Sequence, residues 1–309
     1  MQTMTSSILT KVEGGVATLA LNRPKEMNSF DGDTARIIID TVAAFATDEA
    51  VRVLVVASEG PAFSAGGDFN WVLTWPELDA ITRKVGADAM MGAVQAVYNF
   101  PKPSIARVQG AAVGGGVGLM LACDFAVASS KARFGLTSAR NGLLAGIAIP
   151  VLIQAVGPRK ARQLLMHGGI FDAAAALQIG LVDRVVDADA LDATVAELAG
   201  ELKRGAPSVQ TLVKQLVTEI DGEANDQKPR KHRPEDSQDR QEPRPHHLGP
   251  AALHRPPPSP CAIGLACVIS RSSMGAETEN RPTTPLPPRT LPVHPLCAAS
   301  YFWKSLPFI

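Results

Sequence analysis

The chain contains 309 residues, of which 46% are apolar and 19% charged, and its 30 basic and 30 acidic side chains cancel. A chain of this length can bury a substantial core and form one large domain or two. The balanced charge provides no basic surface of the kind that nucleic-acid-binding and membrane-surface proteins carry. The sequence also lacks a long apolar run, and residues 1–11 do not have the pattern of a secretory signal. These features predict a cytoplasmic protein that binds neither nucleic acid nor membrane.

The averages conceal a change in composition near residue 222. Eight of the 24 prolines lie in residues 1–222 and 16 in the shorter segment 223–309. That segment holds 11 basic and 8 acidic side chains, which leaves 19 basic and 22 acidic side chains before it. Because it has neither helical nor strand periodicity, it is predicted to form a disordered, Pro-rich tail. A Pro-rich ligand for a recognition module and a metal site at His246 and His247 are alternative interpretations.

Regular hydrophobic patterns fill the first 222 residues. The first predicted elements are, in chain order, a hairpin at 8–12 and 16–21, a helix after Asp31, a strand at 51–57, a helix at 78–99 and a strand at 104–108. The next are a helix opening at 114–116, a strand at 124–128, helices near 160–167 and 173–178, a strand at 181–186, and helices at 189–204 and 207–220. Strands that alternate with helices predict an α/β fold with crossover connections.

Two glycine-rich segments follow predicted strands, at the edge where open α/β sheets bind ligands. The first, AFSAGGDFNW, occupies residues 62–71, and the second, GAAVGGG, occupies residues 110–116. Glycine lets a ligand approach the backbone closely, and a helix that starts there presents free N–H groups. Two such donors converging from separate loops would hold a carbonyl oxygen that gains negative charge.

Other motifs are weaker at these segments. A dinucleotide fingerprint starting at Gly114 needs glycine where the chain has Leu119, and no Gly-Lys pair exists for a phosphate-binding loop. The sequence AFSAG at 62–66 is one residue from the GxSxG pattern of serine hydrolases. Its base would be His167, the one histidine before residue 223, for which a structural role is the other interpretation. A Ser64 hydrolase is therefore kept as an alternative.

Five motifs, in their order and spacing, resemble those of the enoyl-CoA hydratase/isomerase (crotonase) family over about residues 8–220. They are LNRP at 21–24, SAGGD at 64–68, ARxxGAAxGGG at 106–116, ACD at 122–124 and AxxLxxGLV at 174–182. The FNW sequence at 69–71 is more similar to the methylglutaconyl-CoA hydratase branch.

This resemblance implies an α/β fold with a crotonase-like ββα spiral core at residues 1–188. It implies a C-terminal helical region at 189–222 that mediates a homotrimer or a dimer of trimers, before the tail at 223–309. The substrate would be an acyl-CoA thioester in fatty-acid or branched-chain metabolism, with no further cofactor and no metal. The tail departs from the helical continuation of the family, which suggests a reading-frame shift that replaced the native C-terminus and weakens trimer assembly.

The resemblance also implies the site residues. The backbone N–H groups of Gly67 and Gly115 would form an oxyanion hole that stabilises a thioester enolate. The residues assigned to the substrate by position are Lys25, Met27, Ala65, Gly66, Asp68, Phe69, Trp71, Gly114, Arg140 and Asn141. An exposed turn for Lys25, a loop cap for Asp68 and ordinary packing for Trp71 are equally compatible with the sequence.

Two substitutions depart from the family pattern. Gly118 and Ser138 occupy the positions where the hydratases carry the two glutamates that hold and activate water. A serine hydroxyl cannot replace a carboxylate as a general base near neutral pH. Glu77 and Asp79 could supply a carboxylate from the segment after Trp75, although a solvated helix N-terminus is the simpler interpretation.

Three functions follow from these residues. The first is an enoyl-CoA hydratase/isomerase-type lyase whose chemistry is altered by the loss of both glutamates. The second is a catalytically silent acyl-CoA-binding paralogue, and the third is the Ser64 hydrolase.

Overall fold

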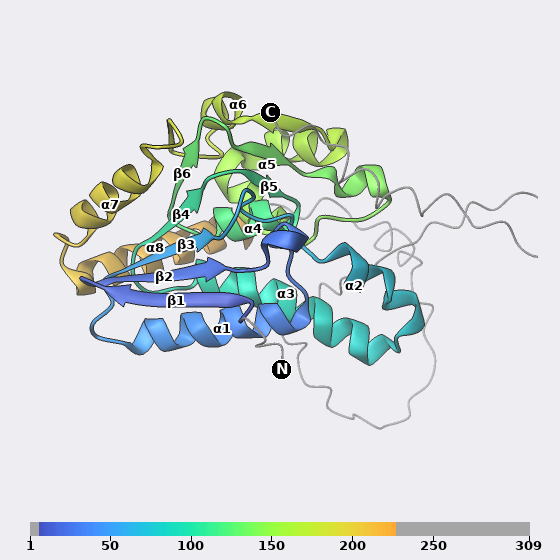
Figure 1. Cartoon of the computed structure of the whole chain (residues 1–309), viewed down its shortest axis with the longest axis horizontal. Coiled ribbons are helices and arrows are strands. Elements are labelled where there is room, and N and C mark those ends of the chain that lie inside the picture. Colours follow the sequence, from blue (N-terminus) through green and yellow to red (C-terminus); the bar gives the residue numbers. More distant parts are fainter. Residues whose placement is uncertain (1–5, 227–309) are drawn as a thin grey trace, which may run out of the picture.

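The computed structural model describes residues 6–226. A six-stranded sheet has the strand order β1-β2-β3-β4-β6-β9, and a second sheet has the order β5-β7-β8 (Figure 1). The strands of the first sheet are β1 (Ile8–Glu13), β2 (Val16–Leu21), β3 (Val53–Ser58), β4 (Ser104–Val108), β6 (Phe125–Ser129) and β9 (Arg184–Val186). Those of the second are β5 (Ala111–Val113), β7 (Arg133–Gly135) and β8 (Ile170–Asp172). From β2 to β9 the first sheet is parallel, which confirms the α/β class.

Helices cover both faces of the six-stranded sheet. They are α1 (Gly32–Thr47), α2 (Phe69–Leu73), α3 (Ala80–Tyr98), α4 (Gly115–Leu121), α5 (Ile149–His167), α6 (Ala173–Gln178), α7 (Leu191–Leu202) and α8 (Pro207–Asp226). Short 3-10 turns are η1 (Pro24–Glu26), η2 (Trp75–Glu77) and η3 (Thr137–Asn141). Among residues 6–226, no helix is both long and apolar enough to span a bilayer.

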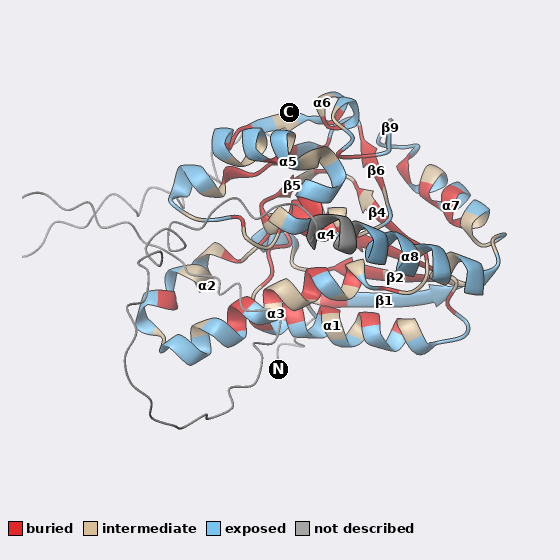
Figure 2. Ribbon diagram, turned by 180° about the vertical axis from the view of Figure 1, so that it is seen from behind, coloured by how far each residue is buried: buried red, intermediate tan, exposed pale blue. Residues whose placement is uncertain are grey.

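Strand β3 illustrates why the central strands are continuous apolar runs. Leu54 and Val56 lie in the core shared with α1 and α3, whereas Val53 and Val55 lie in the core shared with α7. Because both faces of a parallel strand are covered, it does not need polar residues at alternate positions. Figure 2 shows this burial along the central strands and on the inner sides of the helices, whereas the edge strand β1 is mostly exposed.

Helix α8 is attached to the body of the protein by its polar side. Lys214 pairs with Asp124 at 2.9 Å, and the hydroxyl of Thr211 donates to the carbonyl oxygen of Pro101. The Asp124 carboxylate also accepts hydrogen bonds from the backbone N–H and the hydroxyl of Ser104. Asp124 therefore links the start of β4 to α8, which is a structural role.

Most predicted elements are present, with some differences. The hairpin, α3, β4 and α6 lie where the sequence predicts them. Helix α5 begins eleven residues before the predicted Lys160, because the kink at Gly157 (φ 74°) interrupts its hydrophobic pattern. Helix α8 continues to Asp226, so residues 223–226 are helical although they were assigned to a disordered tail. Residues 227–309, with His246 and His247, lie outside the described residues.

Helix α1 begins where its sequence provides a cap. The carboxylate of Asp31 accepts a hydrogen bond from the backbone N–H of Thr34 at 2.9 Å. Burial raises the pKa of Asp31, but the hydrogen bonds from Thr34 and the charge of Arg23 outweigh this effect and hold the pKa below its ordinary value. Since the folded-state pKa is lowered, this stabilisation exists above the unfolded-state pKa of about 3.9 and is lost as the pH falls through the folded-state value.

Replacing this cap provides a test of that ionisation. We expect Asp31→Ala to lower the free energy of unfolding at pH 7 by about 1 kcal/mol. The matched variant Asp33→Ala removes a side chain that is 87% exposed and should change it by less than about 0.5 kcal/mol. Urea denaturation at pH 7 and at pH 3 measures both effects. A deficit in Asp31→Ala that does not shrink at pH 3 would contradict the assigned pKa shift.

Candidate active site

The two glycine-rich segments meet at the carboxyl edge of the sheet. The backbone N–H of Ser64 donates to the carbonyl oxygen of Ala111 at 3.0 Å, and that of Val113 donates to the carbonyl oxygen of Ser64 at 2.9 Å. Ser64 and Ala112 form a parallel β-bridge. The first segment therefore runs directly beside β5 and the start of α4.

Missing side chains permit this close approach. A Cβ atom at Gly116 would overlap the carbonyl oxygen of Ser64, and one at Gly110 would overlap that of Pro61. Gly66 has a φ of +85°, and a Cβ atom on it would lie 2.5 Å from the backbone nitrogen of Gly115. These glycines are required because two backbones contact each other where any side chain would separate them.

Gly67 and Gly115 are brought side by side by this contact. A Cβ atom at Gly115 would lie 3.4 Å from the backbone nitrogen of Gly67. Both residues are partly exposed, and neither backbone N–H donates a hydrogen bond to another residue within 6–226. Gly115 is the first residue of α4, where N–H groups have no partner in their own helix. Two unpaired donors from separate loops thus lie next to each other and are open to a ligand.

Other predicted residues lie on the η1 turn and at the start of α2, which adjoin the first glycine-rich segment. The backbone N–H of Ala65 donates to the carbonyl oxygen of Met27 at 2.9 Å, which joins the η1 turn to the first glycine-rich segment. Lys25 is exposed on that turn, and Phe69 is partly exposed at the start of α2. The methyl group of Met90, on α3, lies 2.7 Å from where a Cβ atom of Gly67 would be. Met90 was not identified from the sequence, since it is one of several apolar residues in a helix.

The two positions of the missing glutamates differ from each other. Ser138, on η3, is partly exposed, and its Oγ lies 3.8 Å from where a Cβ atom of Gly114 would be. Gly118, on α4, is buried, and a Cβ atom there would lie 3.1 Å from the Cα of Ala148. A residue larger than glycine at position 118 would therefore require Ala148, at the start of α5, to shift by a few tenths of an ångström. A side chain can enter the corner more easily from position 138 than from position 118.

Asp68 and Trp71 are occupied by contacts within the protein. One carboxylate oxygen of Asp68 accepts the backbone N–H groups of Asn70 and Trp71, which caps α2, and the other pairs with Arg23 at 2.9 Å. A Cβ atom at Gly86, on α3, would lie 2.5 Å from the ring of Trp71. The ring also stands edge-to-face against Trp75, with centroids 5.2 Å apart. These contacts favour the capping and packing interpretations.

Arg140 and Asn141 lie on the exposed side of η3. The guanidinium of Arg140 donates to the carbonyl oxygen of His167 at 3.1 Å, and its side chain packs over Gly168. Asn141 is exposed at the end of the turn. Arg140 therefore contacts the C-terminal end of α5, where a cation offsets the unpaired carbonyl groups.

The structure also shows the surroundings of the alternative carboxylates, Asp79 and Glu77, and of the alternative nucleophile, Ser64. Asp79 caps α3, and hydrogen bonds from the side chain and backbone of Thr82 hold the pKa of Asp79 below its ordinary value, which makes it a weaker base. Glu77 is exposed on η2. Ser64 is fully buried, and its hydroxyl donates to the carbonyl oxygen of Asn28 and accepts the backbone N–H of Gly66. His167 is exposed at the end of α5.

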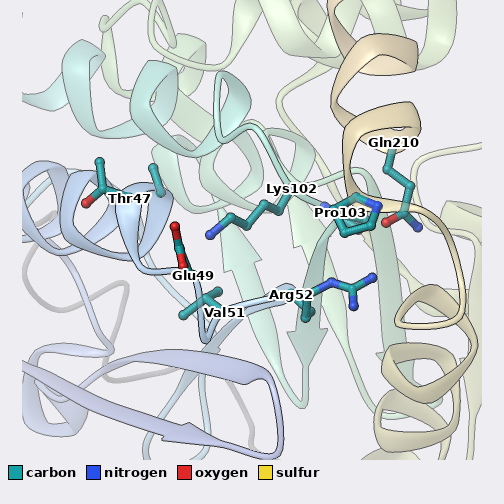
Figure 3. Close-up of a pocket in the computed structure, with 9 residues that line it drawn as sticks. Thr47, Glu49, Val51, Arg52, Lys102, Pro103 and Gln210 are labelled. Atoms are coloured by element: carbon teal, nitrogen blue, oxygen red, sulfur yellow. The ribbon is translucent and has the colours of Figure 1, made fainter.

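A cavity of about 280 Å³ lies at the amino ends of β3 and β4, opposite the glycine-rich corner (Figure 3). Its cations are already paired with carbonyl groups. Arg52 donates to the carbonyl oxygens of Lys203 and Gly205, after α7, and Lys102 donates to those of Phe45 and Asp48, at the C-terminal end of α1. This cavity lies where the ends of helices meet the sheet, and none of the predicted site residues lines it.

Comparison with known proteins agrees with this fold. Residues 11–239 match the sequence model of the enoyl-CoA hydratase/isomerase family. A crotonyl-CoA hydratase of Syntrophomonas wolfei is 35% identical over 198 residues, which cover 63% of this chain and 75% of that protein. A trans-2-decenoyl-[acyl-carrier-protein] isomerase of Streptococcus mutans is 30% identical over 218 residues, which cover 68% of this chain and 81% of that protein.

The solved structures agree as well. An enoyl-CoA hydratase from Shewanella pealeana has a TM-score of 0.67 and 31% identity, over 70% of this chain and 82% of that one. The chain therefore belongs to the enoyl-CoA hydratase/isomerase, or crotonase, family. A relative named as a hydratase and one named as an isomerase are similar to this chain at comparable identity. The comparisons therefore assign the family and not the reaction.

The glycine contact can be tested by adding one methyl group. We expect Gly116→Ala to lower the free energy of unfolding by about 3 kcal/mol, because its Cβ atom would overlap the Ser64 carbonyl group. In the control variant Gly200→Ala, the new methyl group on α7 meets no atom within 4 Å. That variant should gain about 0.5–1 kcal/mol from helix propensity. Chemical denaturation measures both, and equal stability of the two variants would contradict the described contact.

Proposed function

We propose that this protein binds an acyl-CoA thioester and holds its carbonyl oxygen between the backbone N–H groups of Gly67 and Gly115. The reaction class is that of an enoyl-CoA hydratase/isomerase-type lyase acting through a stabilised thioester enolate. The observation that supports it is the placement of two unpaired, partly exposed donors from separate loops beside each other. A carbonyl oxygen that accepts both donors gains negative charge more easily, and each donor of this kind contributes about 10²- to 10³-fold in rate.

Electron flow in this site follows from the position of the donors. When the thioester oxygen is polarised, the β-carbon of a conjugated enoyl group becomes electrophilic and can accept water. The electron pair of the double bond moves onto the thioester oxygen, and the enolate is then protonated at the α-carbon. In isomerisation a conjugated dienolate forms instead, when a 3-enoyl thioester loses a proton from its α-carbon, and it regains a proton at its γ-carbon. The donors are backbone groups held by neighbouring strands, so they need no rearrangement at the moment of reaction.

Proton transfer is the weak step in this site. Position 138 carries a serine hydroxyl, and position 118 is a buried glycine packed closely against Ala148. Asp68 is committed to Arg23, and Asp79 is a weakened base in a helix cap. We therefore expect polarisation of the thioester without an efficient carboxylate base, and turnover well below that of a two-glutamate hydratase.

The close packing of Ala148 against Gly118 also favours a second candidate, a catalytically silent acyl-CoA-binding paralogue. This protein would bind the thioester by the same two donors but would not turn it over. For the third candidate, the Ser64 hydrolase, the nucleophile has no exposure and both functions of its hydroxyl are in use.

We further propose that the protein assembles as a homotrimer or a dimer of trimers through its C-terminal helices. The outer side of α8 supports this, because six of its apolar side chains are about half exposed or more. They are Val209, Leu212, Val213, Leu216, Val217 and Ile220. The cytoplasmic location, the methylglutaconyl-CoA branch, the lack of a further cofactor and the reading-frame origin of the tail stay predictions. Translating the coding DNA in its other frames tests the last of these.

Calorimetry and a hydration assay distinguish the two acyl-CoA functions. We expect crotonyl-CoA and a branched glutaconyl-CoA to bind more tightly than free CoA, because only the thioester offers a carbonyl oxygen to the two donors. Hydration above the uncatalysed rate supports the enzyme, and binding without turnover supports the silent paralogue. Loss of turnover in Glu77→Ala would identify that residue as the base. No binding of either thioester at millimolar concentration would contradict both functions.

Restoring a carboxylate tests the difference between the two substituted positions. We expect Ser138→Glu to accelerate exchange of the α-protons of butyryl-CoA in D₂O by about 10²-fold, since the side chain faces the glycine corner. Gly118→Glu should give no acceleration and should destabilise the fold, because it displaces the start of α5. Proton NMR measures the exchange. Acceleration by Gly118→Glu with unchanged stability would show that position 118 is open after all.

A further inference from the structure

We propose that Arg23 is a positioning residue that fixes the direction of the Gly67 N–H group. This inference rests on the proposed function, because it assigns to a residue outside the site the task of holding one of its two donors. Arg23 lies before the η1 turn, and its side chain is 21% exposed.

Gly67 is held in place by pairing with Phe30. The backbone N–H of Phe30 donates to the carbonyl oxygen of Gly66 at 2.8 Å, and that of Asp68 donates to the carbonyl oxygen of Phe30 at 3.0 Å. Phe30 and Gly67 thus form a parallel β-bridge. The peptide between Gly66 and Gly67 is trans, so the N–H of Gly67 points opposite to the carbonyl oxygen of Gly66, which faces Phe30. The pairing of Gly66 and Asp68 with Phe30 therefore directs the N–H of Gly67 away from Phe30.

Phe30 also contacts the second donor residue. Its side chain is fully buried, and the tip of its ring lies 3.4 Å from where a Cβ atom of Gly115 would be. The backbone of Phe30 thus orients the N–H group of Gly67, while its ring packs against Gly115. A displacement of Phe30 would change the separation of the two N–H groups.

Arg23 joins the two sides of this bridge. Its guanidinium donates to the carbonyl oxygen of Ser29 at 2.9 Å, on the Phe30 side, and to the carboxylate of Asp68 at 2.9 Å, on the Gly67 side. It also lies 3.7 Å from Asp31, which follows Phe30. The planar guanidinium can make these contacts together, whereas a lysine ammonium presents one point of charge. Arg23 therefore holds together the residues that flank Phe30 and Gly67.

The Asp68 side of this arrangement is largely buried. The side chain of Asp68 is 10% exposed and has no other cation among its partners within residues 6–226. Removing Arg23 would leave a carboxylate that needs more water around it, and the start of α2 would move to provide that water. Gly67 directly precedes Asp68, so its N–H would turn with it.

The test uses a probe whose colour reports polarisation of its carbonyl group. Dimethylaminocinnamoyl-CoA carries an electron-donating amine conjugated to the thioester, and its absorption moves to longer wavelength when the thioester oxygen accepts hydrogen bonds. We expect the wild-type full chain to produce this shift. In Arg23→Gln more than half of the shift should be lost, and the preference for the thioester over free CoA should fall about tenfold. Arg23→Lys should retain an intermediate shift.

The control variant is Arg107→Gln. Arg107 has a similarly exposed side chain, at 24%, and pairs with Asp192 of α7, which is 76% exposed and lies away from the two glycine-rich segments. This variant should keep the full shift, even if thermal denaturation shows the same loss of stability as in Arg23→Gln. Affinity for free CoA should be unchanged in all variants, because free CoA has no thioester oxygen. That combination separates a positioning role from a merely structural one.

Two further outcomes have different meanings. If the wild-type chain binds the probe without a shift, the proposed function fails. If the wild-type chain gives the shift and Arg23→Gln or Arg23→Lys gives the same one, the positioning role of Arg23 is overturned while the proposed function stands. If Arg23→Gln does not fold, Asp68→Asn replaces it, and an undiminished shift in that variant likewise overturns the role.

Discussion

The contact between two stretches of bare backbone is the constraint on which the site depends. Gly66, Gly110 and Gly116 each lie where a Cβ atom would meet a backbone atom of the neighbouring segment. Only without those side chains can Gly67 and Gly115 come together with their N–H groups unpaired. The parallel strands β3 and β4 lead the chain to the same edge of the sheet, and α4 starts directly from the contact. In the proposed function, polarisation of a thioester is thus a property of the main chain.

Proton transfer, in contrast, depends on side chains, and this chain has altered them. Ser138 leaves the corner accessible, whereas Ala148 packs closely against Gly118. In the proposed function, the first change removes a base and the second leaves little room for one. Such a site would keep the means to bind and polarise an acyl-CoA and would lose most of the means to move its protons. The two acyl-CoA functions therefore differ by the source of a base and not by the mode of binding.

The sequence predicted the parts of this protein that rest on local or repeated signals. Strand β4 and helix α6 have clear patterns, and the motifs around Gly67 and Gly115 contain the two glycines that lie side by side in the structure. Strands β5, β7 and β8 were missed because each has three residues, too few to show a period. The choice between the two interpretations of Asp68 depends on its contact with Arg23, which lies 45 residues earlier in the chain. The close packing at Gly118 is made by Ala148, which lies thirty residues later in the chain. Such pairs are set by tertiary packing, which no local pattern records.

A crystal structure of the full chain with butyryl-CoA tests most directly whether the two glycine N–H groups hold a thioester oxygen. This saturated thioester has the carbonyl group of a substrate but no double bond to hydrate. We expect its oxygen to lie about 3 Å from the backbone nitrogens of both Gly67 and Gly115. A thioester oxygen bound to neither nitrogen, or CoA bound in the cavity at Arg52 and Lys102, would contradict the proposed function.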